Sequence, residues 1–425
     1  MHATNKIGAY IYIGGKFSRA YSTSTDFISV NNFAAWNGTN WLDYDSGVDD
    51  TVNVIKVDTC RNLYIGGEFA NTLNADTPVA TGPLAKWARG ADKWDKVGTF
   101  EAFNGTVNAI STDCVNMVSK SGCNCDIYIT GNFMLTVDGQ TAQNVAKYDA
   151  NSGKWDTLKG GLPGKVGRAI YKRGLATGIT GDSTKFLHVA GDNFYQQYSF
   201  SSKEWIETNY LPTGIVRSIE YDPEYFSSDN LFFGGDFDFP ISDAVDAPRC
   251  KNVCGFERKT KKWFKMVKSD GAEPNSVVNS MKLVGANSIK DGTGTLFLAG
   301  GFTNTGSSLI AKVSASTAAS LSQVENPFAS TVTSIDACSK TDLYCKENSI
   351  VAAAADGTLK FYDAGDNKAW IDFGDLAMPL KKNVATVGDI HSVMTWNYVG
   401  AASATSVLGY SSAFVMFFAL IAMLF

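Results

Sequence analysis

The chain has 425 residues, a formal net charge of −5, 40 glycines and only 19% charged residues. This composition is typical of many short strands joined by tight turns, and it argues against an α-rich fold. Mild acidity argues against a nucleic-acid partner, because phosphate binding requires a concentrated positive face.

A short apolar run that ends in two small residues recurs along the chain. Its copies are IYIGGKF from Ile11, LYIGGEF from Leu63, IYITGNF from Ile127, LHVAGDNF from Leu187, LFFGGDF from Leu231, FLAGGF from Phe297 and IVAAAADG from Ile350. Repeats of roughly 40–50 residues with paired glycines are typical of β-propeller blades, and insertions lengthen them. Each copy therefore predicts the second strand of one blade.

Each repeat also predicts a third strand that ends in an aromatic residue and an outer strand that starts with Trp. In four repeats these two residues are seven positions apart, namely Trp87 and Trp94, Tyr148 and Trp155, Tyr198 and Trp205, and Phe256 and Trp263. This interval admits a tight turn between antiparallel strands, with both side chains on one face. The sixth repeat has Val313 and Leu321 near these positions.

A further strand of the form V-x-x-I precedes each pair of small residues, from VNVI at Val52 to GDIHSVM at Gly388. The chain begins on a second strand and its last β segment is an innermost strand, so we expect residues 9–44 and 389–396 to share the first blade. The sequence therefore predicts an all-β fold over residues 1–399, a seven-bladed β-propeller of four-stranded blades, closed by a C-terminal inner strand in blade one. Such closure removes free strand edges.

The pattern YIGG-x-F, then N-x-A-x-[WY], then Trp resembles the kelch repeat of the galactose-oxidase-type propeller superfamily. It is similar in more detail to repeats of fungal bud-site-selection and cell-end-marker membrane proteins, and NVAKYDANSGKWDTLKGGL, from Asn144 to Leu162, is the best single match. The resemblance extends from Tyr10 to Trp396. It implies the propeller fold but little about function, because propellers host many unrelated activities.

The eight cysteines are an even number in a chain rich in Gly and aromatic residues, which indicates an oxidising compartment. Local disulfides are expected where two cysteines flank a short connection, namely Cys250 with Cys254 and Cys338 with Cys345. Two further bridges are expected among the cysteines in turns of neighbouring repeats, namely Cys60, Cys114, Cys123 and Cys125. Zinc ligation is the alternative, although no pair of CxxC knuckles is present.

The segment from Val407 to Phe425 is almost wholly apolar, and no charge follows it. Small residues precede it, and the combination describes a glycosylphosphatidylinositol attachment signal with Ser403 as the candidate site of lipid attachment. We therefore expect residues 400–425 to be a small-residue linker followed by a short apolar helix that acts as an anchor or is removed as a signal. A tail-anchored transmembrane helix is the alternative.

The N-terminus has no basic and then apolar secretory pattern. A lipid-anchored, disulfide-bonded product needs a leader, so we interpret the chain as lacking its true N-terminal leader. A cytosolic protein is the alternative. Glycosylation sequons at Asn37 and Asn104 add slight support for an extracellular glycoprotein.

The sequence contains no catalytic signature. A galactose-oxidase-like copper site needs two His and two Tyr, and the three histidines, His2, His188 and His391, do not allow the family's arrangement. No sialidase box, Gly-x-Ser-x-Gly, P-loop or HExxH is present. We therefore expect no enzyme activity, cofactor or metal, although an Asp/Glu pair acting in acid–base catalysis is compatible with the spacing.

Long loops between second and third strands are expected in four repeats, at residues 18–32, 70–83, 134–144 and 238–252. They emerge on one face of the predicted ring, and long ordered loops on a rigid scaffold usually carry function. Because Tyr, Phe and Arg suit interface anchors, the candidate partner-binding residues are Arg19, Tyr21, Phe27, Phe239 and Arg249. Lineage-specific variation of the loops is the alternative.

Together these features favour a non-enzymatic propeller at the cell surface, on the extracellular side of the plasma membrane. It would bind a protein or glycan partner in an adhesion, cell-wall or polarity-type role. A secreted or anchored carbohydrate-active enzyme that uses the central funnel is the first alternative. An intracellular protein-interaction propeller with reduced cysteines is the second.

Overall fold

The computed structural model describes residues 9–21, 26–37, 40–74, 77–115, 124–172, 186–207, 212–221, 230–258, 260–266, 273–284, 295–303, 310–314, 321–324, 328–337, 349–363, 369–371 and 386–397. Within these ranges the regular elements are strands. None of the described segments forms a helix with the length and apolar character that crossing a membrane requires. The predicted tail at 400–425, with its short helix and Ser403, lies outside the described residues.

Six sheets have four strands each, and every one of them begins with its innermost strand and ends with its outermost strand. The first contains β5 (Val52–Val57), β6 (Leu63–Gly67), β9 (Leu84–Trp87) and β10 (Asp95–Lys96), with a hairpin of β7 (Asn71–Thr72) and β8 (Val79–Ala80) inserted. The second contains β11 (Ala102–Val115), β12 (Asn124–Val137), β13 (Gln140–Asp149) and β14 (Lys154–Asp156). The third contains β15 (Gly167–Lys172), β16 (Phe186–Gly191), β17 (Phe194–Ser199) and β18 (Glu204–Glu207).

The other three four-stranded sheets follow the same order along the chain. They contain β19 (Gly214–Tyr221), β20 (Asn230–Pro240), β21 (Arg249–Glu257) and β22 (Lys262–Phe264); β23 (Val278–Val284), β24 (Thr295–Gly300), β25 (Ile310–Ser314) and β26 (Leu321–Gln323); and β27 (Val332–Ala337), β28 (Ile350–Ala354), β29 (Leu359–Asp363) and β30 (Ala369–Ile371). The recurrence of this order confirms that the repeats are propeller blades.

The two ends of the chain share the remaining sheet, which we call the closing sheet. It contains β31 (Thr386–Asn397), β1 (Ala9–Tyr21), β3 (Phe33–Trp36), β4 (Trp41–Leu42) and β2 (Phe27–Ser29). Residues of β31 pair with β1 from Ala9 to Ala20, which confirms the predicted pairing of the last inner strand with the first segment.

The structure thus has six four-stranded blades where the sequence predicted seven, and the closing sheet has five strands. The extra strand arises because β1 is 13 residues long. Its first part, Ile11–Gly14, pairs with β3, whereas its last part, Arg19–Tyr21, pairs with β2. Most of the described residues in the loop predicted at 18–32 are therefore strand, at 18–21 and 27–29.

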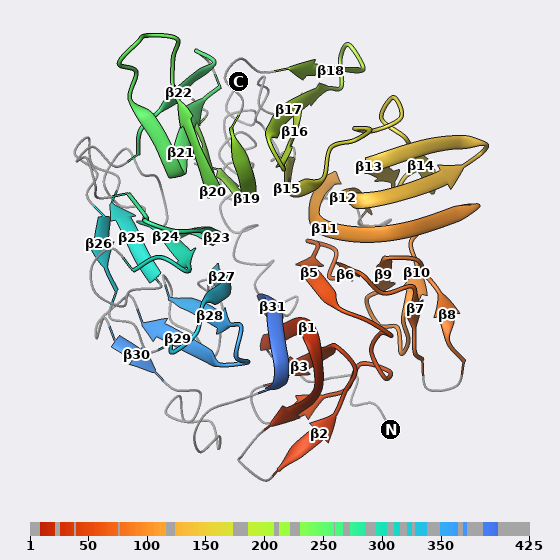
Figure 1. Cartoon of the computed structure of the whole chain (residues 1–425). Coiled ribbons are helices and arrows are strands. Elements are labelled where there is room, and N and C mark those ends of the chain that lie inside the picture. The colour runs from red at the N-terminus through yellow and green to blue at the C-terminus, as the bar shows by residue number, and fades with distance from the viewer. Residues whose placement is uncertain are drawn as a thin grey trace, which may run out of the picture.

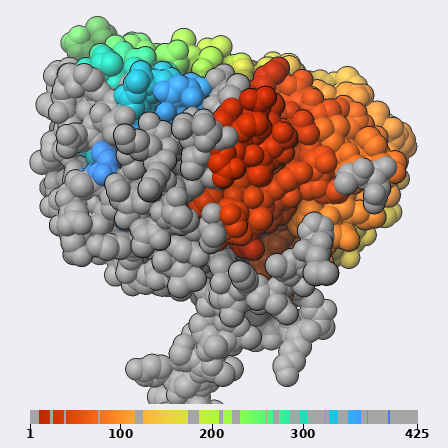
Figure 2. Space-filling model, turned by 90° about the horizontal axis from the view of Figure 1, so that it is seen from below, coloured from red at the N-terminus to blue at the C-terminus, as the bar shows by residue number. Residues whose placement is uncertain are grey.

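The innermost strands surround a common axis (Figure 1). Each contacts the next in the order β5, β11, β15, β19, β23, β27 and β31, and β31 in turn contacts β5, so the ring is closed. Figure 2 shows the surface of the closing sheet, in red, adjoining that of the next blade, in orange. Closure buries both faces of each sheet, which one four-stranded sheet alone cannot do.

The paired small residues of each repeat have two different roles. The second residue lies opposite a β-bulge in the innermost strand: a Cβ on Gly67 would lie 2.0 Å from the carbonyl oxygen of Thr51. The first residue faces the next blade: a Cβ on Gly66 would lie 2.6 Å from Cγ1 of Val107. Small residues are therefore required at both positions. The second approaches the backbone of the innermost strand in its own blade, and the first approaches a side chain of the next blade.

The Trp of the outer strand links its blade to the preceding one. Its indole N–H donates to a backbone carbonyl of that blade in three cases, Trp94 to Tyr44, Trp155 to Val97 and Trp205 to Leu158, with distances of 2.8, 3.0 and 2.9 Å. The strand registers confirm the predicted facing pairs Tyr148 with Trp155, Tyr198 with Trp205 and Phe256 with Trp263, and place Val313 opposite Leu321. The outer Trp therefore both fills the space between blades and fixes their relative position.

Candidate functional site

Within the described residues, each of the four predicted long loops contributes a two-stranded ribbon. They are β1 with β2, β7 with β8, the last part of β12 with the first part of β13, and the last part of β20 with the first part of β21. Each ribbon follows the small-residue pair of a second strand, so all four lie at the end of the ring where the innermost strands begin. We call this set the ribbon face.

Three of the predicted partner-binding residues meet on the β1–β2 ribbon. Tyr21 lies directly opposite Phe27 in the register, and their ring centroids are 5.2 Å apart. The guanidinium carbon of Arg19 lies 4.5 Å from the Phe27 centroid, and its Nη1 donates a 3.4 Å hydrogen bond to the Tyr21 hydroxyl. Phe27 remains 39% exposed. The three side chains therefore hold one another in a fixed arrangement on the ribbon.

The base of this cluster is fixed to the blade. The indole N–H of Trp41 on β4 donates a 3.0 Å hydrogen bond to the carbonyl oxygen of Tyr21. Ala20, between Arg19 and Tyr21, is fully buried. The exposed side chains of Arg19 and Phe27 and the half-buried Tyr21 ring therefore stand on a fixed part of the closing sheet.

The two candidates on the β20–β21 ribbon differ from one another. Arg249 is exposed and forms a 2.7 Å ion pair with Asp238 on the opposite strand. Phe239 is only 1% exposed, and its ring packs 5.0 Å from that of Trp263. Phe239 therefore anchors the ribbon to its blade from inside and is not available as a surface contact. The alternation of a two-sided ribbon turns it inward.

The β12–β13 ribbon exposes an apolar side chain that was not among the predicted candidates. Met134 is 52% exposed and lies directly opposite Asn104 on β11. Asn104, which carries the second sequon, is also exposed. Asn37, in the first sequon, is half-buried, and its side-chain oxygen accepts a 2.8 Å hydrogen bond from the Asn40 N–H. The Asn104 side chain therefore lies at the surface, whereas a local hydrogen bond holds the Asn37 side chain.

Polar side chains at the bulges of the innermost strands form a second candidate region around the axis. His391 Nδ1 lies 3.2 Å from Asn53 Oδ1, and Asn53 Nδ2 donates to Asn108 Oδ1 at 3.4 Å. Asn108 Nδ2 in turn donates to the Gly167 carbonyl at 2.9 Å. Arg168 is paired with Asp192 through two N–O contacts of 3.0 and 3.2 Å. The contacts from His391 to Asn53, from Asn53 to Asn108 and from Asn108 to Gly167 join successive blades, whereas Arg168 and Asp192 belong to the same blade.

Serine hydroxyls one residue after the bulge positions also form hydrogen bonds between adjacent blades. The hydroxyl oxygens of Ser218, Ser280 and Ser334 accept hydrogen bonds from the backbone N–H groups of Met281, Ile335 and Val393, at 3.2, 3.3 and 3.3 Å respectively. Each bond crosses to the innermost strand of the following blade. The recurring x-S-[IVM] pattern of these strands therefore closes the gap between blades with a polar contact.

Four charged side chains form a layer around the axis, which we call the axial charge layer. Lys56, Glu220, Lys282 and Asp336 each follow the apolar residue of the V-x-x-I pattern or its Met variant. They come from four different blades and interact electrostatically with one another, which requires that they face the axis. Lys282 Nζ lies 3.2 Å from Asp336 Oδ1.

The electrostatic environment of this layer is uneven. Burial raises the pKa of Glu220 above its usual range, although Lys282 and Lys56 oppose the shift. Asp336 and then Glu220 raise the pKa of Lys282, whereas burial lowers that of Lys56. The side chains of Lys282 and Asp336 keep 34% and 14% exposure, so the layer borders solvent. Sequence reasoning identified the strands but missed the layer; the signal was a charge at one fixed position in four repeats.

The histidines have structural contacts. His188 is fully buried on β16, its Nδ1 lies 2.9 Å from the Tyr195 hydroxyl, and burial holds its pKa well below the usual value. His391 takes part in the axial contacts described above, and His2 lies outside the described residues. Of the two described histidines, His188 thus lies in the core of a blade and His391 lies near the axis.

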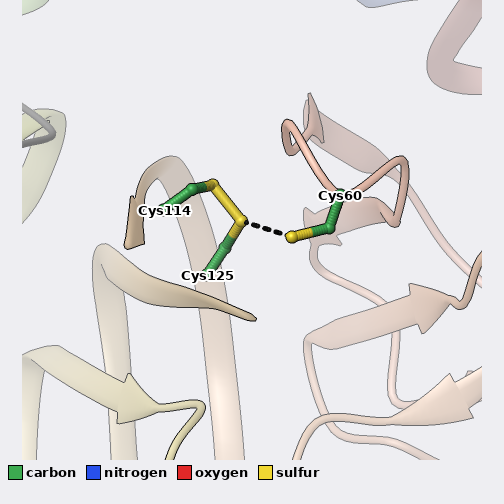
Figure 3. Close-up of side chains that lie close together, drawn as sticks. All are labelled: Cys60, Cys114 and Cys125. Atoms are coloured by element: carbon green, nitrogen blue, oxygen red, sulfur yellow. Dashed lines mark hydrogen bonds between the residues drawn. A yellow bond between two sulfur atoms is a disulfide. The ribbon is translucent and has the colours of Figure 1, made fainter. Parts of the chain in front are cut away.

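The predicted Cys250–Cys254 disulfide is present. Of the two bridges predicted among the other neighbouring cysteines, Cys114–Cys125 is present. Cys60 is also disulfide-bonded, with a partner outside the described residues. Cys123, Cys338 and Cys345 lie outside the described residues. Cys60, Cys114 and Cys125 lie together between two blades (Figure 3).

Comparisons with known proteins give no family assignment. No family model matches the chain, and no curated protein matches it. Among solved structures, the chain is similar to one titled "Crystal structure of RRP9 WD40 repeats", with a TM-score of 0.44 and 8% sequence identity, over 80% of this chain and 82% of that chain. The assignment of the fold rests on the sheets and their closure, and the function on the site itself.

Proposed function

We propose that this protein is a non-enzymatic β-propeller that binds a protein partner through its ribbon face. The observation that carries the proposal is the cluster of Arg19, Tyr21 and Phe27 on a ribbon fixed by the Trp41 hydrogen bond. Arg and aromatic side chains dominate binding energy at protein interfaces, and rigid side chains lose little entropy on binding. Met134, which is 52% exposed on the β12–β13 ribbon two blades further along the ring, offers a separate apolar contact on the ribbon face.

The broader role we propose is that of a kelch-like propeller displayed on the cell surface and attached through residues 400–425. The two described disulfides and the exposed Asn104 sequon support an oxidising, extracellular setting. A protein or a glycan would be the partner. Release of the full chain from cells by a phosphatidylinositol-specific phospholipase tests the lipid anchor; retention with the apolar tail still present by mass spectrometry contradicts it.

The binding proposal is tested with the double substitution Arg19→Ala and Phe27→Ala. Full-length chains are crosslinked to surface-biotinylated cell proteins, and the captured proteins are quantified by mass spectrometry. The matched control is Ile206→Ala on β18, because Ile206 is 36% exposed outside the ribbons. We expect one or more proteins to be captured by the parent and by the control but depleted about tenfold or more with the double variant. Equal capture by all three chains contradicts the proposal.

A carbohydrate-active enzyme is the second candidate function, and the axial charge layer is the observation that favours it. Glu220, with a raised pKa, has the character of a general acid, whereas Asp336 is paired with Lys282. Pairs of carboxyl groups with different environments are typical of glycoside hydrolysis. A glycan turnover screen with the parent and Glu220→Gln tests it: reproducible turnover that the substitution abolishes supports an enzyme, and absence of turnover favours the binding protein.

A further inference from the structure

Three cysteines from two adjacent blades lie close together, and we call them the sulfur cluster: Cys60, Cys114 and Cys125. Cys114 and Cys125 are directly opposite residues of β11 and β12, with Cα atoms 3.9 Å apart. Cys60 lies in the turn between β5 and β6, and its Sγ is 3.1 Å from that of Cys125 (Figure 3). All three sulfur atoms lie within 4.8 Å of one another. The cluster therefore contains three sulfur donors around one point.

The surroundings of the sulfur cluster are apolar. Cys60 and Cys125 are 8% and 3% exposed, and both belong to the hydrophobic cluster that contains Tyr64 and Ile127. The hydroxyl of Thr59 lies 3.9 Å from the Cys125 sulfur. Sulfur donors in an apolar shell select soft metal ions over hard oxygen-seeking cations.

We propose that the sulfur cluster, when reduced, is a thiolate site for one zinc ion and that this form excludes the disulfide form. Zinc–sulfur bonds of about 2.3 Å in tetrahedral geometry separate the ligand sulfurs by roughly 3.8 Å. The three sulfurs lie within 4.8 Å of one another, and those of Cys114 and Cys125 would move apart toward this spacing once their disulfide is reduced. Water or one further donor would complete the tetrahedron. The inference goes beyond the binding function and concerns the chain in a reducing environment.

Reduction of the disulfides precedes zinc binding. A dithiol reductant supplies two electrons and two protons to each disulfide and closes into its own disulfide, which leaves the cysteines as thiols. Zinc then displaces one proton from each of the three thiols as the thiolates bind it. The bound metal ties the β5–β6 turn to the β11–β12 hairpin. Zinc therefore stabilises the contact between these two blades in the reduced chain.

The test uses the full chain, reduced with a dithiol without oxygen and then freed of reductant. Zinc affinity is measured by competition with a chromophoric chelator, and bound metal by elemental mass spectrometry. We expect one zinc per reduced chain and none per oxidised chain. Cys60→Ser and Cys125→Ser each lower the affinity about tenfold or more. The matched control, Cys250→Ser with Cys254→Ser, removes the other described disulfide and keeps the affinity.

Three results would overturn the proposal. One is a folded reduced chain that binds no zinc, and another is zinc binding that the control lowers as much as Cys125→Ser does. The third applies if the reduced chain unfolds and loses its circular-dichroism spectrum: failure of zinc to restore the spectrum overturns the proposal. Restoration of the spectrum by zinc supports the site. Cobalt substitution gives an independent readout, because three thiolates in tetrahedral geometry produce intense charge-transfer absorption that oxygen or nitrogen ligands do not.

Discussion

Substitution of Trp155 by Phe removes one hydrogen bond between two blades and leaves an aromatic ring in place. The Trp155 indole N–H donates to the Val97 carbonyl at 3.0 Å, and the side chain is 8% exposed. Trp263 is the matched comparison, because it is 4% exposed and faces an aromatic residue in the same way. Its indole N–H, however, has no hydrogen-bond partner within the described part of the chain.

Both substitutions remove a similar amount of ring, so their difference isolates the hydrogen bond. Trp155→Phe leaves the Val97 carbonyl without its donor, which costs about 1–3 kcal/mol for a buried group. Trp263→Phe removes a buried donor that already lacked a partner, so this penalty is absent. We therefore expect Trp155→Phe to lower the free energy of unfolding by about 1–3 kcal/mol more than Trp263→Phe does.

The assay is equilibrium unfolding in guanidinium chloride, followed by far-ultraviolet circular dichroism without reductant so that the disulfides stay intact. Coincident transitions by fluorescence establish that a single free energy of unfolding describes each chain. Trp155→Ala sets the upper limit, since removal of the whole ring from a core costs about 3–5 kcal/mol. Equal losses for the two Phe substitutions, or a larger loss for Trp263→Phe, would refute the role assigned to the indole hydrogen bond.

The remaining predictions concern close packing and titration. Gly300→Ala should lower the free energy of unfolding by about 1–3 kcal/mol or more, because its Cβ would lie 2.0 Å from the Val277 carbonyl oxygen. The neighbouring substitution Gly301→Ala should be nearly neutral, because no atom would lie closer than 3.4 Å to its Cβ. Similar losses of stability for the two variants in chemical denaturation would contradict this prediction. Hydrogen bonding from the Ser152 N–H, and then Lys147, lower the pKa of Asp149 to about 2, so its stabilising contribution is present above pH 3.8 and is lost as the pH falls through about 2. Melting temperatures of Asp149→Asn between pH 5 and 2 should lack this component, and an unchanged pH profile would argue against it. Burial raises the pKa of Glu220 above 4.5, so the parent should lose stability as the pH rises from 4.5 through the raised pKa; Glu220→Gln should flatten that slope, and a slope as steep as the parent's would contradict the assignment.

The sequence by itself determined the modular plan. The paired small residues, the facing aromatic and Trp, and the V-x-x-I strands recur at propeller spacing, and each is a local requirement of one sheet. Their phase along the chain also predicted that β31 completes the sheet of β1. The same local patterns predicted only four strands in the closing sheet, however. The fifth strand, β2, was missed because β1 continues beyond the residues that pair with β3, and its last residues pair with β2.

The candidate site was only partly contained in the sequence. Loop length identified the four ribbons, and residue type identified Arg19, Tyr21 and Phe27, which the β1–β2 register brings together. Residue type alone misplaced Phe239, since the direction in which a ribbon side chain points depends on register and on the blade beneath it. Met134 escaped notice for the same reason.

The tertiary structure alone decided which residues of different blades meet. Lys56 and Glu220 are far apart in the chain, as are Cys60 and Cys125, and no spacing rule relates them. They approach because the ring closes on itself, which turns equivalent positions of separate repeats toward one axis or one interface. Periodicity specifies the face of a strand on which a side chain lies, but only the stacking of the blades supplies its neighbour.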